Sequence, residues 1–286
     1  MSTLTEPSGA ETTGSNNRYF TRFTTEQVVL HAVLVVTFLG LAATGLALRF
    51  SNAAWSRALA NGMGGIPAVL FVHKFLAVAL TIDFLYHVFD IARRVLFKKE
   101  WWLLWGPNSL VPNLKDIQDF FGQVRWFLFM GPQPKFDRFT YWEKLDYWGV
   151  FWGMAVIGIS GYAMWFAPFF ARIVPGSMLN VALLIHGEEA LLAVSYIFVV
   201  HFFNEHLRPQ NFPMDVTIFT GRQTEEEFEE RHPEEYARLV EQGKLETLKA
   251  GPPTASSVKL SRIFGTAAIV IGIVLMILTA EAFLSH

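Results

Sequence analysis

The amino-acid sequence predicts an all-α membrane protein whose chain crosses the bilayer five times. Of its 286 residues, 52% are hydrophobic and 27 are phenylalanine. About 20 residues of α-helix cross the hydrocarbon core of a bilayer, and a soluble protein does not need apolar runs of that length. Five such runs are present, at about 26–48, 67–92, 147–170, 179–203 and 263–284.

The distribution of basic residues predicts the orientation. Of the 23 Lys and Arg residues, 19 precede the first run or lie in the second and fourth connections, whereas three lie in the other two connections. Basic residues favour the cytoplasmic side, so we expect the N-terminus inside and the C-terminus outside. The chain has no cysteine, which excludes disulfides, thiolate metal sites and covalently attached c-type haem. A net charge of −2 argues against nucleic acid as a partner.

The chain divides into six segments by composition. The polar N-terminal residues predict a disordered tail rather than a signal peptide. An amphipathic pattern at 113–129, after the aromatic run "WWLLW", indicates either a helix in the inner membrane interface or an ordinary packed surface helix. The expected segments are a tail (1–17), transmembrane helices 1 and 2 (18–100), the inner interfacial segment (101–145), helices 3 and 4 (146–206), a cytoplasmic acidic helical segment (207–260) and helix 5 (261–286).

Histidines recur in the apolar runs at two depths. His73 and His87 of the second run are about 21 Å and −40° apart on an ideal helix, and an isolated histidine there packs or relays protons. His186 and His201 of the fourth run are about 22 Å and +60° apart. Haem b takes two imidazoles from opposite sides, and helices of a bundle supply them. The spacing therefore predicts a four-helix bundle that binds two stacked bis-histidine haems b, with the fifth helix as an anchor.

The ligands of the outer haem follow directly from depth, and those of the inner haem do not. His73 and His186 share the outer level. At the inner level His201 pairs with either His31 or His87. A third haem is required if His31, His87, His201 and His206 form two inner pairs. A zinc or di-iron site would need more ligands converging within one turn.

From Arg18 to about Glu246 the chain resembles the di-haem cytochrome b subunits of formate dehydrogenases, Ni-Fe hydrogenases and thiosulfate reductases, in the branch of cytochrome b/b6-domain proteins. The motifs that carry the resemblance are "RYFTRFTTEQVVLHAVLVVTFLGLAATGLALRF", "VHKF", "FTYWEKLDYWGVFWG", "IHGEEALLA" and "HFFNEHLRPQNFPMDVTIFTG". The resemblance implies His31, His73, His186 and His201 as haem ligands. His87 departs from that pattern, which leaves the partner of His201 open.

Haems at two depths need redox partners at both faces. Quinone is the expected partner in the membrane, and its site requires groups that bond or titrate near a haem. The candidates are Asn204 and His206 on the inner side, Glu188 and Glu189 on the outer side, and Asp83 within the second run. Helix-end residues of these types also commonly meet headgroups or water.

The sequence thus predicts an electron-transfer subunit of a quinone-linked oxidoreductase complex. The resemblance implies the bacterial inner membrane and a periplasmic partner, either a multihaem c-type cytochrome or an iron–sulfur subunit. The alternative is a membrane anchor or assembly subunit that lacks haem and whose histidines relay protons.

Overall fold

The computed structural model describes residues 17–209, 211–212 and 214–285, so the expected tail lies outside the described residues except for Asn17. The described chain is mostly helical. Four helical stretches are long and apolar enough to cross a membrane: α1 (Thr25–Arg49), α3 (Ile66–Leu96), the run Ser177–Leu207 and α12 (Ala255–Leu284). These helices support the all-α membrane class and a multi-pass protein.

The third predicted crossing has a different local structure. Its residues form α5 (Tyr141–Gly153), the π-helical turn η2 (Met154–Gly158) and α6 (Ile159–Trp165), followed by the short α7 (Ala167–Phe170). The run Ser177–Leu207 is likewise composite, with α8 (Ser177–Ser195), η3 (Tyr196–His201) and η4 (Phe203–Leu207). A π turn closes on i→i+5 hydrogen bonds, so it holds about one more residue than an α turn and rotates the helical residues after it.

Local sequence sets the helix ends. The Thr24 side chain accepts from the backbone N–H of Gln27, and the Gln27 side chain returns the bond, which is a capping box at the start of α1. Between α1 and α3 the short α2 (Ala54–Met63) ends at Gly64, whose φ of 100° is accessible to glycine. Pro67 then occupies the first turn of α3, where its missing N–H costs nothing.

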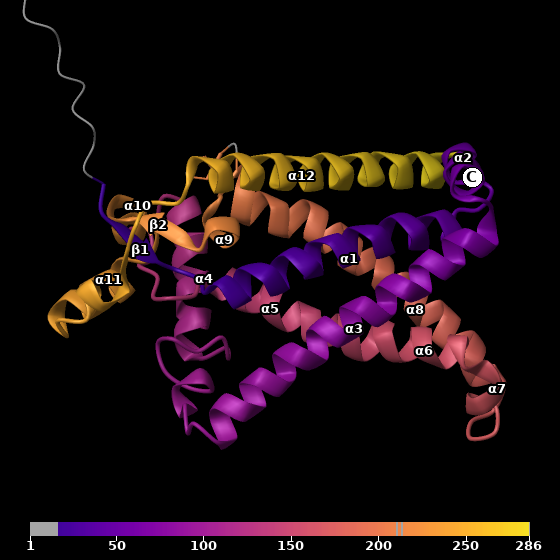
Figure 1. The fold of residues 1–286 in the computed structure, drawn as a ribbon, viewed down its shortest axis with the longest axis horizontal. Coiled ribbons are helices and arrows are strands. Elements are labelled where there is room, and N and C mark those ends of the chain that lie inside the picture. The colour runs from indigo at the N-terminus through magenta and orange to yellow at the C-terminus, as the bar shows by residue number, and fades with distance from the viewer. Residues whose placement is uncertain (1–16, 210, 213, 286) are drawn as a thin grey trace, which may run out of the picture.

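The long helices separate two ends of the molecule (Figure 1). One end carries α2, α7 and the C-terminus, and the other carries β1, β2, α4 (Leu114–Phe127), α10 (Glu225–Arg231) and α11 (Pro233–Glu241). In the same view α4 runs across the direction of α12. The remaining short elements are η1 (Trp101–Leu103), α9 (Thr217–Thr220) and η5 (Leu245–Leu248).

A small sheet ties the N-terminal residues to the acidic segment, which no local pattern in the sequence predicts. Strand β1 (Tyr19–Thr21) lies between β2 (Arg222–Thr224) and β3 (Lys249–Ala250), antiparallel to both. Phe20 of β1 is fully buried against Phe228 and Leu245. The acidic segment is therefore a packed unit with its own apolar core, and its helix α11 begins at Pro233.

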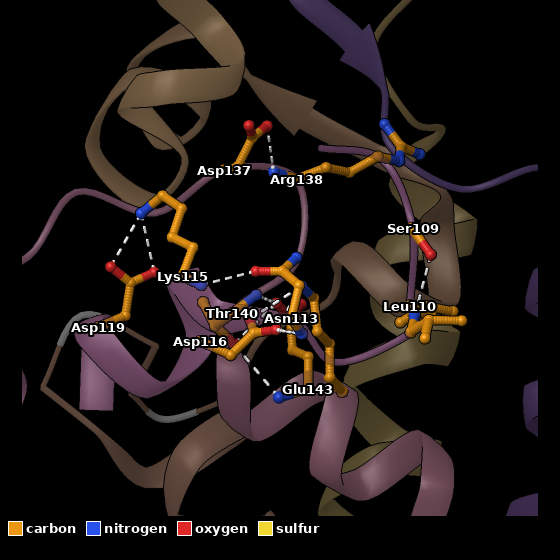
Figure 2. A network of polar contacts seen from close by, with 12 residues as sticks. Ser109, Leu110, Asn113, Lys115, Asp116, Asp119, Asp137, Arg138, Thr140 and Glu143 are labelled. Carbon is orange, nitrogen blue, oxygen red and sulfur yellow. Dashed lines mark hydrogen bonds and ion pairs between the residues drawn. The ribbon is translucent and has the colours of Figure 1, made fainter. Parts of the chain in front are cut away.

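The helix α4 has one paired face and one exposed face. Asn113 and Asp116 form its capping box (Figure 2). Lys144 of α5 pairs with Asp116 at 2.8 Å. The apolar row predicted from the sequence stays exposed: Leu114, Ile117, Phe121, Val124 and Leu128 are between 37% and 78% accessible. An exposed apolar row is the surface that a helix lying in the membrane interface buries in the lipid.

Candidate functional site

Two histidine clusters lie at different levels of the helical bundle. We name them for the predicted orientation: the outer pair is His73 and His186, near the end that carries α2 and α7, and the inner cluster is His31, His201 and His206. In the outer pair the ring centroids are 6.3 Å apart and the ring planes are inclined by 75°. The structure thus brings together the two histidines that the sequence paired by depth.

The tautomer of His73 is set by a threonine of α1. The Thr44 hydroxyl donates to the carbonyl oxygen of Gly40 at 2.6 Å, which uses its one proton. The same hydroxyl oxygen lies 2.9 Å from His73 Nδ1 and must accept from it. The proton of His73 is therefore on Nδ1, and Nε2 carries the lone pair.

The tautomer of His186 is set by the π turn η2. His186 Nδ1 donates to the carbonyl oxygen of Ile157 at 2.9 Å, and Ile157 belongs to η2. The Ser160 hydroxyl, which donates to the Val156 carbonyl at 2.6 Å, lies 3.4 Å from the same nitrogen. In the part of the chain that the structure describes, no hydrogen bond reaches the Nε2 atom of His73 or His186.

A glycine lies against each ring of the outer pair. A Cβ atom built on Gly45 would approach His73 Cε1 to 3.2 Å, and one built on Gly161 would approach His186 Cε1 to 3.0 Å. Both distances are tighter than ordinary contact, so any larger residue would push on an imidazole. We call α1 and α3 the first helical hairpin, and α5, α6 and α8 the second. The same contact occurs in both hairpins, because Thr44–Gly45 of α1 and Ser160–Gly161 of α6 begin the similar segments "TGLALRF" and "SGYAMWF".

In the inner cluster, one histidine is held by a carboxylate. His201 Nδ1 donates to Asp146 Oδ2 at 2.9 Å, and Tyr196 donates its hydroxyl proton to Asp146 Oδ1 at 2.7 Å. His201 is the last residue of η3. Because one π turn absorbs about one residue, His201 lies roughly 14 rather than 15 α-helical positions after His186. His201 therefore faces nearly the same side of the helix as His186.

The other two inner histidines meet at a phenylalanine. Phe219 of α9 packs on His31 with centroids 5.7 Å apart and stacks on His206 at 6.4 Å. The rings of His201 and His206 are 6.2 Å apart. The Nδ1 atoms of His31 and His206 are buried without a hydrogen-bond partner among the described residues.

His87 does not join the inner cluster. Its Nε2 lies 3.0 Å from the Tyr147 hydroxyl, and its ring packs edge-on against Tyr147 and Phe151. Among the described residues, no three histidine or acidic side chains gather into one metal-binding group.

The predicted quinone or proton groups are dispersed. Asn204 lines a cavity of about 240 Å³ between η4, the start of α5 with the loop before it, and the junction of α10 and α11, together with Glu205 and Arg208. His206 is 6% exposed and does not line that cavity. The structure therefore does not bring the two inner candidates into one pocket.

The two outer glutamates are both engaged. Glu188 accepts from Arg49 Nη2 at 2.7 Å, and Glu189 accepts from Trp152 Nε1 at 3.2 Å. Asp83 is half-buried in α3, and no hydrogen bond or ion pair reaches its carboxylate from another described residue. None of these three carboxylates touches the outer pair through a hydrogen bond.

Sequence reasoning missed the residues that position the imidazoles. These are Thr44, Gly45, Asp146, Ser160 and Phe219. The repeated hydroxyl–glycine dipeptides Thr44–Gly45 and Ser160–Gly161 were visible in the sequence and contain three of them. Nothing comparable marks Asp146 or Phe219, whose partners lie far away along the chain.

Comparison with known proteins adds no assignment: the chain matches no protein-family profile and no curated protein at a significant level.

Proposed function

We propose that this chain is a membrane cytochrome b subunit that carries electrons between the quinone pool and a redox partner at the outer face. The outer pair carries the proposal. A bond from a first-row metal to an imidazole nitrogen is about 2 Å, so two imidazoles on opposite sides of one metal ion have ring centres roughly 6 Å apart. The 6.3 Å between the centroids of His73 and His186 fits that requirement.

The hydrogen bonds of the outer pair fit the same role. A histidine that binds a metal usually donates its other ring N–H to a carbonyl, hydroxyl or carboxylate, which fixes the ring and makes the free nitrogen more basic. Both His73 and His186 donate from Nδ1. Haem b bound there supplies a one-electron redox centre. The residues of this chain fix the two rings, and their glycine neighbours leave the rings unobstructed.

For the inner level, we propose His31 and His201 as the ligands. His201 has the supporting carboxylate that a ligand needs. His31 packs on Phe219, the ring that also stacks on His206 beside His201. His87 instead uses Nε2, the nitrogen that His73 and His186 leave free, to contact Tyr147. We therefore infer two haems, with His87 packed outside both sites.

We also propose the number of membrane crossings, the orientation of the chain and the membrane in which it lies. We place the run 141–165 as the third of five crossings, the N-terminus inside, and the chain in a bacterial inner membrane. The inner cavity beside Asn204 is the proposed place where quinone chemistry exchanges protons with the inside. A periplasmic multihaem c-type cytochrome or iron–sulfur subunit is the proposed outer partner.

A reduced-minus-oxidised absorption spectrum of the purified protein tests the function. We expect the α band of b-type haem and a pyridine haemochrome count of two per chain. A protein that is folded but shows no such band would contradict the proposal and favour the haem-free subunit with proton-relay histidines.

A further inference from the structure

Two cationic side chains lie beside the outer pair, and the proposed function leaves them unexplained. Arg49 is the last residue of α1 and reaches across to α8. Its guanidinium packs on Gly187, where a Cβ would collide with Nη1, and it pairs with Glu188. Gly187 and Glu188 directly follow His186. Arg49 therefore contacts the two residues that follow His186 in α8.

Lys74 occupies the matching place beside the other ring. It directly follows His73 in α3, and its Nζ lies 5.0 Å from the ring centroid of Trp165 in α6. Trp165 follows Ser160, which contacts His186, by the same interval as Arg49 follows Thr44, which contacts His73. The helices α1 and α3 thus each carry one cation that contacts the other pair of helices, Arg49 at Gly187 of α8 and Lys74 at Trp165 of α6.

The position of Lys74 in an apolar helix favours an anionic partner. An ammonium group inside an apolar helix is costly unless it pairs with a negative group or reaches the interface. Within the described residues Lys74 has no ion pair, and the Trp165 ring offers only a cation–π contact. Arg49 has five N–H donors, so it retains donors after binding Glu188.

We propose that Arg49 and Lys74 bind the two propionate carboxylates of the outer haem, and this inference rests on the proposed function. Two carboxylates on one edge of the macrocycle match two cations that lie beside the two ligands. A lipid phosphate offers Lys74 the same kind of anion, but it does not account for an arginine that lies over the residue next to His186.

Redox titration of the purified holoprotein in nanodiscs of zwitterionic lipid tests the assignment. The outer haem is identified as the component that His73→Ala removes. A nearby cation stabilises the reduced iron and offsets the propionate charge, so Lys74→Gln and Arg49→Gln should each lower the midpoint potential of the outer haem. The inner haem should keep its potential, and the propionate-bending band in the resonance Raman spectrum should shift for the outer haem alone.

Two variants serve as controls. Lys74→Arg keeps the charge and should keep the outer potential near that of the wild type. Arg57→Gln removes an outer-end cation of α2 that bonds only the Asn52 carbonyl among the described residues, and should change neither potential.

The outcomes separate the two proposals. An unchanged outer potential and Raman band in Lys74→Gln and Arg49→Gln, with two haems still bound, overturns the propionate assignment and leaves Lys74 as a headgroup anchor. A shift that appears only when anionic lipid is added also overturns it in favour of an anionic lipid headgroup. Absence of haem from the wild-type protein overturns the proposed function and this inference together.

Discussion

The outer pair and the inner cluster use the same side chain in two different ways. In the outer pair both Nδ1 atoms are bonded, both rings rest against glycines, and the supporting groups come from neighbouring helices of the bundle. In the inner cluster only His201 has such support, and the Nδ1 atoms of His31 and His206 lack partners among the described residues. The inner rings are instead packed around Phe219.

The difference shows which of the two histidine sites is positioned by short segments of the long helices and which needs a distant segment of the chain. The outer pair is positioned by two short repeated segments, so its geometry is a property of two hairpins. The inner cluster needs α9, which follows the last ligand helix and packs under α12 through the contact between Phe219 and Phe264. We expect the outer site to be rigid and the inner site to depend on the segment that closes it.

The largest expected effect that separates the two levels is the loss of the inner haem. His201→Ala and His31→Ala should each reduce the haem count from two to one, because each removes a proposed axial ligand. His87→Phe should keep both haems, since His87 contacts Tyr147 instead. Pyridine haemochrome assay of purified variants measures this. Loss of haem in His87→Phe with retention in His31→Ala would make His87 the inner ligand.

A smaller effect is expected from the group that supports His201. Asp146→Asn replaces the acceptor of the Nδ1 proton, and losing such a partner typically weakens metal binding about 10- to 100-fold. Retention of the inner haem during dialysis against apomyoglobin measures the loss. Tyr196→Phe is the matched control, because it removes the other bond to Asp146 and leaves the carboxylate on His201. Equal losses in both variants would contradict a direct role for the carboxylate.

The glycines of the outer pair should show a graded response. Gly161→Ala places a Cβ 3.0 Å from His186 Cε1, and overpacking of this kind costs about 1–3 kcal/mol. We expect weaker retention of the outer haem and a shifted spectrum. Gly45→Ala, at 3.2 Å, should do less. Gly149→Ala has open space around its Cβ and should leave the haem unchanged, so a loss there equal to that in Gly161→Ala would count against the packing argument.

The smallest effect concerns acidity at the inner end. Burial, and then the charge of Arg22, holds the pKa of His232 well below its usual range. Below about pH 6.5 the unfolded chain therefore binds a proton that the folded chain does not, and the free energy of unfolding falls as pH decreases, by at most about 1.4 kcal/mol per unit. Hydrogen exchange of β2 and α11, corrected for intrinsic rates, measures this.

His232→Asn supplies the control for that pH dependence. An asparagine amide retains a donor toward the Asp137 carbonyl, which His232 Nδ1 contacts at 2.8 Å, but it does not titrate. Protection that falls equally in both proteins on acidification would assign the effect to another group.

The sequence predicted the features that depend on periodicity and failed where distant segments meet. Apolar length located the four long helices, and helical rise placed His73 opposite His186. The same arithmetic placed His201 about 60° from His186, because it assumed an ideal helix, whereas η3 inserts a π turn. The pairing of β1 with β2 and the contact of Phe219 with His31 join segments that no local pattern relates.

The central claim is that His73 and His186 hold one metal centre, and the haem count of their single variants tests it most directly. His73→Ala and His186→Ala should each leave one haem per chain with an unchanged inner spectrum, and the double variant should lose no more than either single one. Two haems retained in either single variant, or additive losses in the double variant, would contradict the pairing.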